Sequence, residues 1–268
     1  MKKLSDVGRI FYGISIAGIG FPTIYYKSFP YMLFPPEHFL NAVPAILYYI
    51  SGALLILIGA CIVFEIKTRQ VSLLFGGVLL LIFCFCFVPY EFMVNSNYKH
   101  LAEWENAEKE LQLAGGAFLI AGCFSEKNEN HLYRFLGKLI PFGAIFFAIP
   151  IISYGILHFQ FAKDVSTMVP SWIPNPIFWT YFAGTALLGS GIAIIFKIKP
   201  VLIAALLGTM IFIWFIIIHV PGVIASPSAD LGGQVTSAFL ALAYSGIAFV
   251  IAGAAKKKVD LHVKEKSI

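Results

Sequence analysis

Residues 200–220 read PVLIAALLGTMIFIWFIIIHV, an apolar run that contains no Asp, Glu, Lys or Arg. A helix needs about 20 apolar residues to cross the hydrocarbon core of a bilayer, and this run has that length. Lys197 and Lys199 precede the run, and Pro221 follows it. The stretch therefore predicts one membrane-spanning helix with basic residues at one of its ends.

Seven more segments of similar character lie elsewhere in the chain. Only 12% of the 268 residues are charged and 59% are hydrophobic, whereas about 25% of a soluble domain is charged. In the fourth segment only the part from Leu111 to Phe124 is strongly apolar, so that helix must continue outward past Lys109 to reach the headgroups. We predict an all-α polytopic membrane bundle of about eight transmembrane helices. The predicted spans are 8–26, 44–64, 70–90, 106–124, 139–161, 177–196, 200–220 and 235–254.

Lysine and arginine residues are distributed unevenly between the two ends of these spans. With the N-terminus in the cytoplasm, 15 of the 19 fall on cytoplasmic segments, and the other 4 are Lys27, Lys99, Lys109 and Lys163. Cytoplasmic loops carry an excess of Lys and Arg. We therefore predict a multi-pass protein of the cell membrane, in contact with the lipid bilayer, with both termini cytoplasmic. The same distribution assigns the net charge of +5 to membrane anchoring, and we expect no nucleic-acid partner.

The two halves of the chain align when one is shifted along the other. At a shift of 131, residues 115–122 (GGAFLIAG) fall on residues 246–253 (GIAFVIAG), with six of eight identical. Each half holds four spans, an even number, so we expect parallel repeats. We predict an N-terminal repeat at 1–125, a C-terminal repeat at 132–256 and a basic cytoplasmic tail at 257–268. At a shift of 132 the matching pairs are Gly52 and Gly184, Gly59 and Gly191, Gly76 and Gly208, and Val88-Pro89 and Val220-Pro221.

Two histidines end predicted spans on the outer face of the membrane. His158 ends the fifth span and His219 the seventh, and both of these helices run outward, so the imidazoles should lie at similar depth. Aromatic residues and one carboxylate at the same face extend this candidate site. The candidate ligand-binding residues are His158, His219, Trp172, Trp179, Tyr181 and Glu91.

Each of these residues has two interpretations. Imidazole titrates near neutral pH and can hydrogen-bond a quinone oxygen or ligate a metal; a histidine at the membrane interface is more often satisfied by water or a loop carbonyl. Trp172 and Trp179 form a lid over an outer cavity, or they sit in the headgroup belt. Glu91 joins the histidines or caps a loop in water. The four acids of residues 103–110 are interpreted as a solvated start of the fourth helix, and no metal-binding spacing is present.

The second half resembles the DoxX-like family of small membrane proteins. The segments that carry the resemblance are GILHF (155–159), VPSWIP (169–174), FWTYFAG (178–184), HVP (219–221) and TSAF (236–239). The first half shares only glycines and Val88-Pro89, and looks like a diverged second copy. The resemblance implies a four-helix membrane unit found mainly in bacteria, hence in the bacterial inner membrane. The family takes its name from a subunit of an archaeal quinol oxidase and thiosulfate–quinone oxidoreductase system, so the resemblance also implies a quinone-linked role.

Three functions follow from these observations. The first is a redox accessory role at the outer face, with quinone as the ligand and a membrane redox partner. The second is a small-molecule transporter between the two repeats, although intramembrane ionisable residues look scarce for this role. The third is a non-catalytic scaffold or accessory subunit. The residues leave open whether the protein is an enzyme, because no nucleotide-binding or zinc-protease motif is present.

Overall fold

The structure is a computed structural model that describes residues 2–30, 44–126 and 130–266. All regular elements in these ranges are helices, which confirms the predicted all-α polytopic bundle. The longer helices are α1 (Lys2–Tyr26), α2 (Ala45–Val63), α3 (Thr68–Ile82), α5 (Glu105–Cys123), α7 (Gly143–Gln160), α9 (Pro176–Ile195), α10 (Pro200–Trp214) and α12 (Gly233–Lys266). The short ones are α4 (Val88–Met93), α6 (His131–Gly137), α8 (Ala162–Ser166) and α11 (Val220–Ala225).

Seven helical segments of the described chain are long and apolar enough to cross a membrane. Large apolar side chains such as Leu54, Leu81 and Leu202 are more than half exposed on their outer faces, as expected where lipid replaces water. The protein is therefore an integral, multi-pass membrane protein. The seven segments are α1, α2, α3 continued through α4, α6 continued through α7, α9, α10 continued through α11, and α12.

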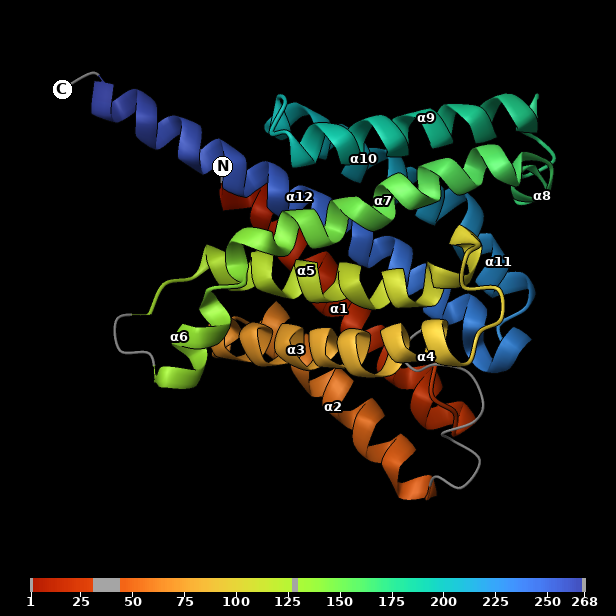
Figure 1. Ribbon diagram of the computed structural model, residues 1–268, viewed down its shortest axis with the longest axis horizontal. Coiled ribbons are helices and arrows are strands. Elements are labelled where there is room, and N and C mark those ends of the chain that lie inside the picture. The colour runs from red at the N-terminus through yellow and green to blue at the C-terminus, as the bar shows by residue number, and fades with distance from the viewer. Residues whose placement is uncertain (1, 31–43, 127–129, 267–268) are drawn as a thin grey trace.

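The fourth predicted span, 106–124, corresponds to α5, which is not among these seven; it is as long as α2 but carries charged residues in its first two turns. It lies between α3 and α7 and also packs against α12 (Figure 1). Most of its residues are buried, including the run from Glu110 to Phe118. The neighbours of α5, more than its own composition, keep it inside the bundle.

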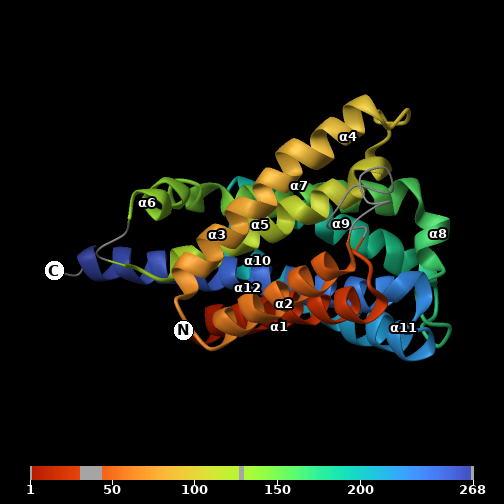
Figure 2. The same ribbon diagram turned by 90° about the horizontal axis from the view of Figure 1, so that it is seen from below.

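The bundle has two distinct ends. Both termini and α6 lie at one end, here named the terminal end, and α8 and α11 lie at the other, here named the α8–α11 end; Figure 2 shows the same division from a perpendicular direction. α12 continues as a helix to Lys266, so the predicted tail prolongs the last span, and residues 267–268 lie outside the described residues.

Two arginines tie helices together at the terminal end. Arg9 of α1 donates to the carbonyl oxygens of Ile62 and Val63 at 2.5 and 2.7 Å and pairs with Glu65 at 2.8 Å. Arg69 of α3 donates to two carbonyl oxygens at the end of α5, both at 2.9 Å. The last carbonyls of a helix lack intrahelical partners and carry partial negative charge, so each guanidinium satisfies and stabilises a helix end.

Glycines permit the closest helix contacts. A Cβ on Gly115 would lie 2.6 Å from the carbonyl oxygen of Gly143, and one on Gly143 would lie 2.7 Å from that of Gly115. Gly8 and Gly246 face each other in the same reciprocal way between α1 and α12. Small residues let membrane helices approach this closely, because little else than packing and hydrogen bonding holds helices together in lipid.

The same local conformations recur 132 residues apart. Glu65 and Lys197 both have positive φ, 59° and 56°, in the tight turns that follow α2 and α9. The helices after these turns, α3 and α10, each continue into a five-residue π-helical segment, Phe83–Phe87 and Phe215–His219. Pro89 and Pro221 follow at equal spacing. A proline inside a helix removes one backbone donor and crowds the preceding turn, and a π-helical bulge accommodates this.

Candidate functional site

A cavity of about 470 Å³ lies among α5 of the first half of the chain and α7, α9, α10 and α12 of the second half. It is named the chamber here. Apolar side chains from these helices, among them Leu187, Met210 and Ile211, form much of its wall. Its polar and aromatic lining consists of Glu105, Lys109, Tyr154, His158, Trp179, Thr180, Trp214, His219, Gln234, Ser237 and Tyr244. The chamber therefore has the mixed character typical of a small-molecule site.

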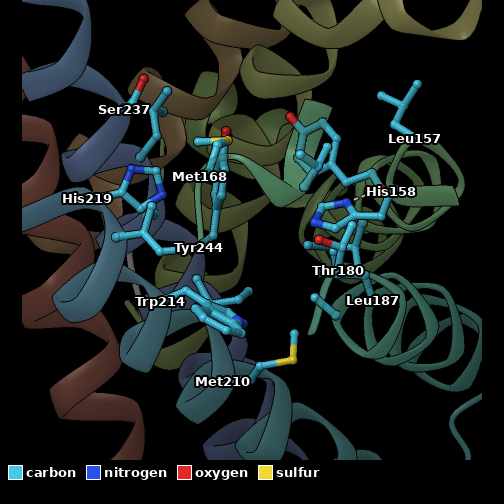
Figure 3. Close-up of a pocket in the computed structure, with 18 of the residues that line it drawn as sticks. Leu157, His158, Met168, Thr180, Leu187, Met210, Trp214, His219, Ser237 and Tyr244 are labelled. Atoms are coloured by element: carbon cyan, nitrogen blue, oxygen red, sulfur yellow. Dashed lines mark hydrogen bonds between the residues drawn. The ribbon is translucent and has the colours of Figure 1, made fainter. Parts of the chain in front are cut away.

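His158 and His219 lie on opposite sides of the chamber, with Tyr244 and Trp214 between them (Figure 3). The Nδ1 atom of His158 lies 2.7 Å from the carbonyl oxygen of Tyr154, one helical turn earlier. A carbonyl can only accept, so Nδ1 carries the proton, and in the neutral ring Nε2 is left as an acceptor. His158 is thus held in one tautomer and offers its lone pair to a ligand.

His219 reaches the chamber from the last position of the π-helical segment after α10. A π-helical segment inserts an extra residue into the helical turn and changes the direction in which the following side chains point. The residue 132 positions earlier is Phe87, which is fully buried in the first half. The histidine pair is therefore a feature of the second half only.

Three buried polar atoms of the chamber wall make no hydrogen bond to the rest of the protein. The indole Nε1 of Trp214 has no partner among the described residues, and the hydroxyls of Tyr154 and Tyr244 face only each other. Buried polar groups are nearly always hydrogen-bonded, and an orphaned one costs about 1–3 kcal/mol. Buried hydrogen-bonding groups of this kind around one cavity suit a ligand that carries polar atoms.

A second, almost wholly apolar cavity of about 760 Å³ adjoins the chamber between α9 and α10. It is named the groove here. Trp179, Met210 and Trp214 line both cavities, so the two meet at this wall. The loop residues Trp172, Ile173 and Pro174 close one side of the groove.

The structure brings together some of the predicted site residues and separates others. His158, His219 and Trp179 line the chamber, and Trp172, which is 71% exposed, lines the groove. Tyr181 lines neither cavity, and its ring stacks on Phe159 with 5.6 Å between centroids.

Glu91 also lies outside both cavities. It belongs to α4, is buried, and accepts a hydrogen bond of 2.7 Å from Asn95. The amide of Asn95 also donates to Glu103 at 3.2 Å, so Glu91 is part of a polar contact between α4 and the loop that leads to α5.

The sequence interpretation missed the contribution of α5 and was wrong about two of the four acids of residues 103–110, since Glu103 and Glu105 are exposed but Glu108 and Glu110 are not. Glu105 and Lys109 line the chamber and form an ion pair of 2.8 Å. Glu108 is 8% exposed and Glu110 is fully buried, so these two are not part of a solvated helix start. The length of the span could have indicated this. A helix of 19 residues that ends at Cys123 begins at Glu105, so Glu108 and Glu110 lie within the span and not before it.

The described residues contain no group of three or more His, Cys, Asp or Glu side chains arranged to hold a metal ion. The chamber instead offers hydrogen-bond donors and acceptors around an aromatic interior. Comparison with known proteins gives no further guidance: no family model, no curated protein and no solved structure matches the chain.

Proposed function

We propose that this membrane protein binds the head group of a quinone or quinol in the chamber. The observation that carries the proposal is that His158 and His219 line one cavity from opposite sides. A quinol carries two hydroxyl groups at opposite positions of a flat ring, and a quinone carries two carbonyl oxygens there. The Nε2 atom of His158 is an acceptor that suits a hydroxyl, and His219 faces it across the cavity.

The rest of the chamber suits the same ligand. Trp214, Tyr154 and Tyr244 line the chamber with aromatic rings and three donors, of which the indole Nε1 of Trp214 has no partner among the described residues. Aromatic pairs stabilise one another by about 0.5–1.5 kcal/mol beyond simple burial. A quinone oxygen would accept a hydrogen bond from these donors. Binding would then remove the free-energy cost of a donor that is buried without a partner.

The groove supports a ligand with a long apolar tail. Because it meets the chamber at Trp179, Met210 and Trp214, a molecule with its ring in the chamber can extend its tail between α9 and α10. Leu206 and Ile213, which line the groove, are about half exposed on the outside of the bundle. The tail therefore lies where a molecule dissolved in the lipid would meet the protein.

We place the α8–α11 end on the outer side of the membrane and the terminal end in the cytoplasm. The excess of Lys and Arg at the terminal end supports this orientation. We also propose that the two halves are copies of one four-helix unit, the second of the DoxX-like type. The equal spacing of the turns at Glu65 and Lys197 and of the two π-helical segments supports the duplication.

Proton-coupled transport is the second candidate function. The observation that favours it is the full burial of Glu110 inside the bundle, since ionisable residues in membrane-embedded positions usually mark transport or proton pathways. A proteoliposome uptake screen distinguishes the two functions. Uptake of a solute would support transport, whereas a protein that only binds quinone would move none.

The quinone proposal is tested on protein purified in mild detergent. We expect quinone to copurify with the wild type, and its content to fall at least about threefold in His219→Ala, as the loss of one hydrogen bond to the ligand implies. The matched control is His131→Ala, an exposed histidine of α6 outside both cavities. Equal quinone content in the wild type and both variants would contradict the proposal.

A further inference from the structure

The helix α5 carries two carboxylates, Glu108 and Glu110, inside the bundle. Both oxygens of Glu110 have no hydrogen-bond partner among the described residues, whereas Glu108 faces the hydroxyl of Ser153. The side-chain amide of Gln112, one turn beyond Glu108, also lacks a hydrogen-bond partner among the described residues. The amine of Lys109 pairs with Glu105 and with Asn106, at 2.8 and 3.1 Å.

Glu110 lies deep in the bundle. The hydroxyl of Tyr12 donates to the carbonyl oxygen of Leu113 at 2.7 Å, which places the middle of α5, one turn after Glu110, beside the middle of α1. Tyr12 is ten residues from the start of α1, or about 15 Å along its axis at 1.5 Å per residue. The side chain of Glu110 has no exposed surface, so an ionised, unpaired carboxylate there would cost many kcal/mol.

The groups around Glu108 connect it to the chamber, because Glu105, Lys109 and Tyr154 line that cavity. Tyr244 of α12 lies within electrostatic range of Glu105, Glu108 and Glu110, and it lines the chamber. Ser153 and Tyr154 of α7 face Glu108, and Tyr12 of α1 faces Glu110. The charged groups nearest to Glu108 are Glu105 and Lys109, which pair with each other.

We infer that Glu108 and Glu110 are intramembrane protonation sites on opposite faces of α5, and that Glu108, one turn after the chamber-lining Glu105, exchanges protons with the chamber. Each carboxylate takes up one proton to become a neutral carboxylic acid and releases it again, and no electron transfer is involved. A neutral carboxylic acid has no charge to compensate and only one O–H group to donate. It therefore fits a site with few hydrogen-bond partners. The inference does not depend on the identity of the ligand in the chamber.

The site belongs to the first half of the chain, whereas the histidines belong to the second. At the shift of 131 residues, Glu108 and Glu110 fall on Phe239 and Ala241 of α12. The lining of the chamber likewise combines Glu105 and Lys109 of the first half with His158 and His219 of the second. This division gives the first half a role in the site beyond packing.

Infrared spectroscopy of the purified, reconstituted protein tests the inference. A neutral carboxylic acid has a C=O stretching band that an ionised carboxylate lacks. We expect this band in the wild type at neutral pH, a loss of part of it in Glu110→Gln and in Glu108→Gln, and no change in Glu126→Gln, an exposed acid in the turn after α5. A band that is absent from the wild type, or that neither α5 variant reduces, would overturn the inference.

Two further measurements complete the test. A hydrophobic carbodiimide reacts with protonated carboxyl groups in apolar surroundings, so peptide mapping of the labelled wild type should find label on Glu108 or Glu110, and this readout needs no variant to fold. Label confined to exposed acids would count against the site.

A C=O band that appears only when sodium is removed would assign the site to a metal cation instead of a proton. Because quinone content is measured separately, the protonation site and the quinone proposal can fail independently.

Discussion

The indole rings of Trp179 and Trp214 pack edge to face, with 6.3 Å between their centroids. One ring comes from the first turn of α9 and the other from the last residue of α10, and both rings line the chamber and the groove. The two rings form part of the wall between the chamber, which carries several polar side chains, and the groove, which is almost wholly apolar. A ligand that spans the wall has a polar head and an apolar tail.

The groove should distinguish ligands by the length of their tails. Ser190 lines the groove from α9, so Ser190→Phe fills space that the tail needs. We expect about tenfold weaker binding of a long-chain quinone, or about 1.4 kcal/mol, because the displaced tail loses apolar burial at about 25 cal/mol per Å². Binding of a short-chain analogue should be unchanged, and both affinities can be measured by equilibrium titration.

The control for this prediction is Thr185→Phe, which adds the same ring to an exposed position of α9 outside both cavities. It should leave both affinities unchanged. An equal loss for short and long tails in Ser190→Phe would show that the tail does not lie in the groove.

Close helix packing makes a second prediction, on stability. In Gly115→Ala the new Cβ meets the backbone oxygen of Gly143 at 2.6 Å, so α5 and α7 must move apart. Overpacking of this kind costs about 1–3 kcal/mol, and we expect a lower thermal unfolding midpoint in detergent. Gly189→Ala is the matched control, because nothing lies within 4 Å of its Cβ position. It should leave the midpoint unchanged or raise it, since Ala favours a helix more than Gly does.

A third prediction concerns orientation in the membrane. In a protein without its own cysteines, Lys199→Cys at the terminal end should react with a membrane-impermeant thiol reagent only after the cells are opened. Ser171→Cys, in the loop between α8 and α9 at the opposite end, should react in intact cells. The reverse pattern would place the chamber on the cytoplasmic side and contradict the proposed orientation.

The positions of the spans could be predicted because they depend on the sequence of each segment alone. Residues 200–220, for example, are apolar along their whole length and end at a proline, and the structure has α10, its π-helical continuation and α11 there. The π-helical segments themselves could not be predicted. They depend on a shift of the hydrogen-bond ladder ahead of Pro89 and Pro221, which side-chain hydropathy does not report.

The candidate site could be predicted only in part, for a related reason. Their positions at the ends of two outward-running helices predict one depth for His158 and His219, and both line the chamber together with Trp179. Glu108 and Glu110 were misjudged because charge predicts exposure unless neighbours exclude water, and α3, α7 and α12 do so here.

Photoaffinity labelling with a quinone that carries a light-activated azide on its ring tests the central claim most directly. The label should attach to residues 154–158, 179–180 or 210–219, the parts of α7, α9 and α10 that face the chamber. An excess of unlabelled quinone should prevent this attachment, and mass spectrometry of the peptides would locate it. Labelling that competes but lies only in residues 2–104, or labelling that unmodified quinone does not reduce at all, would contradict a quinone site in the chamber.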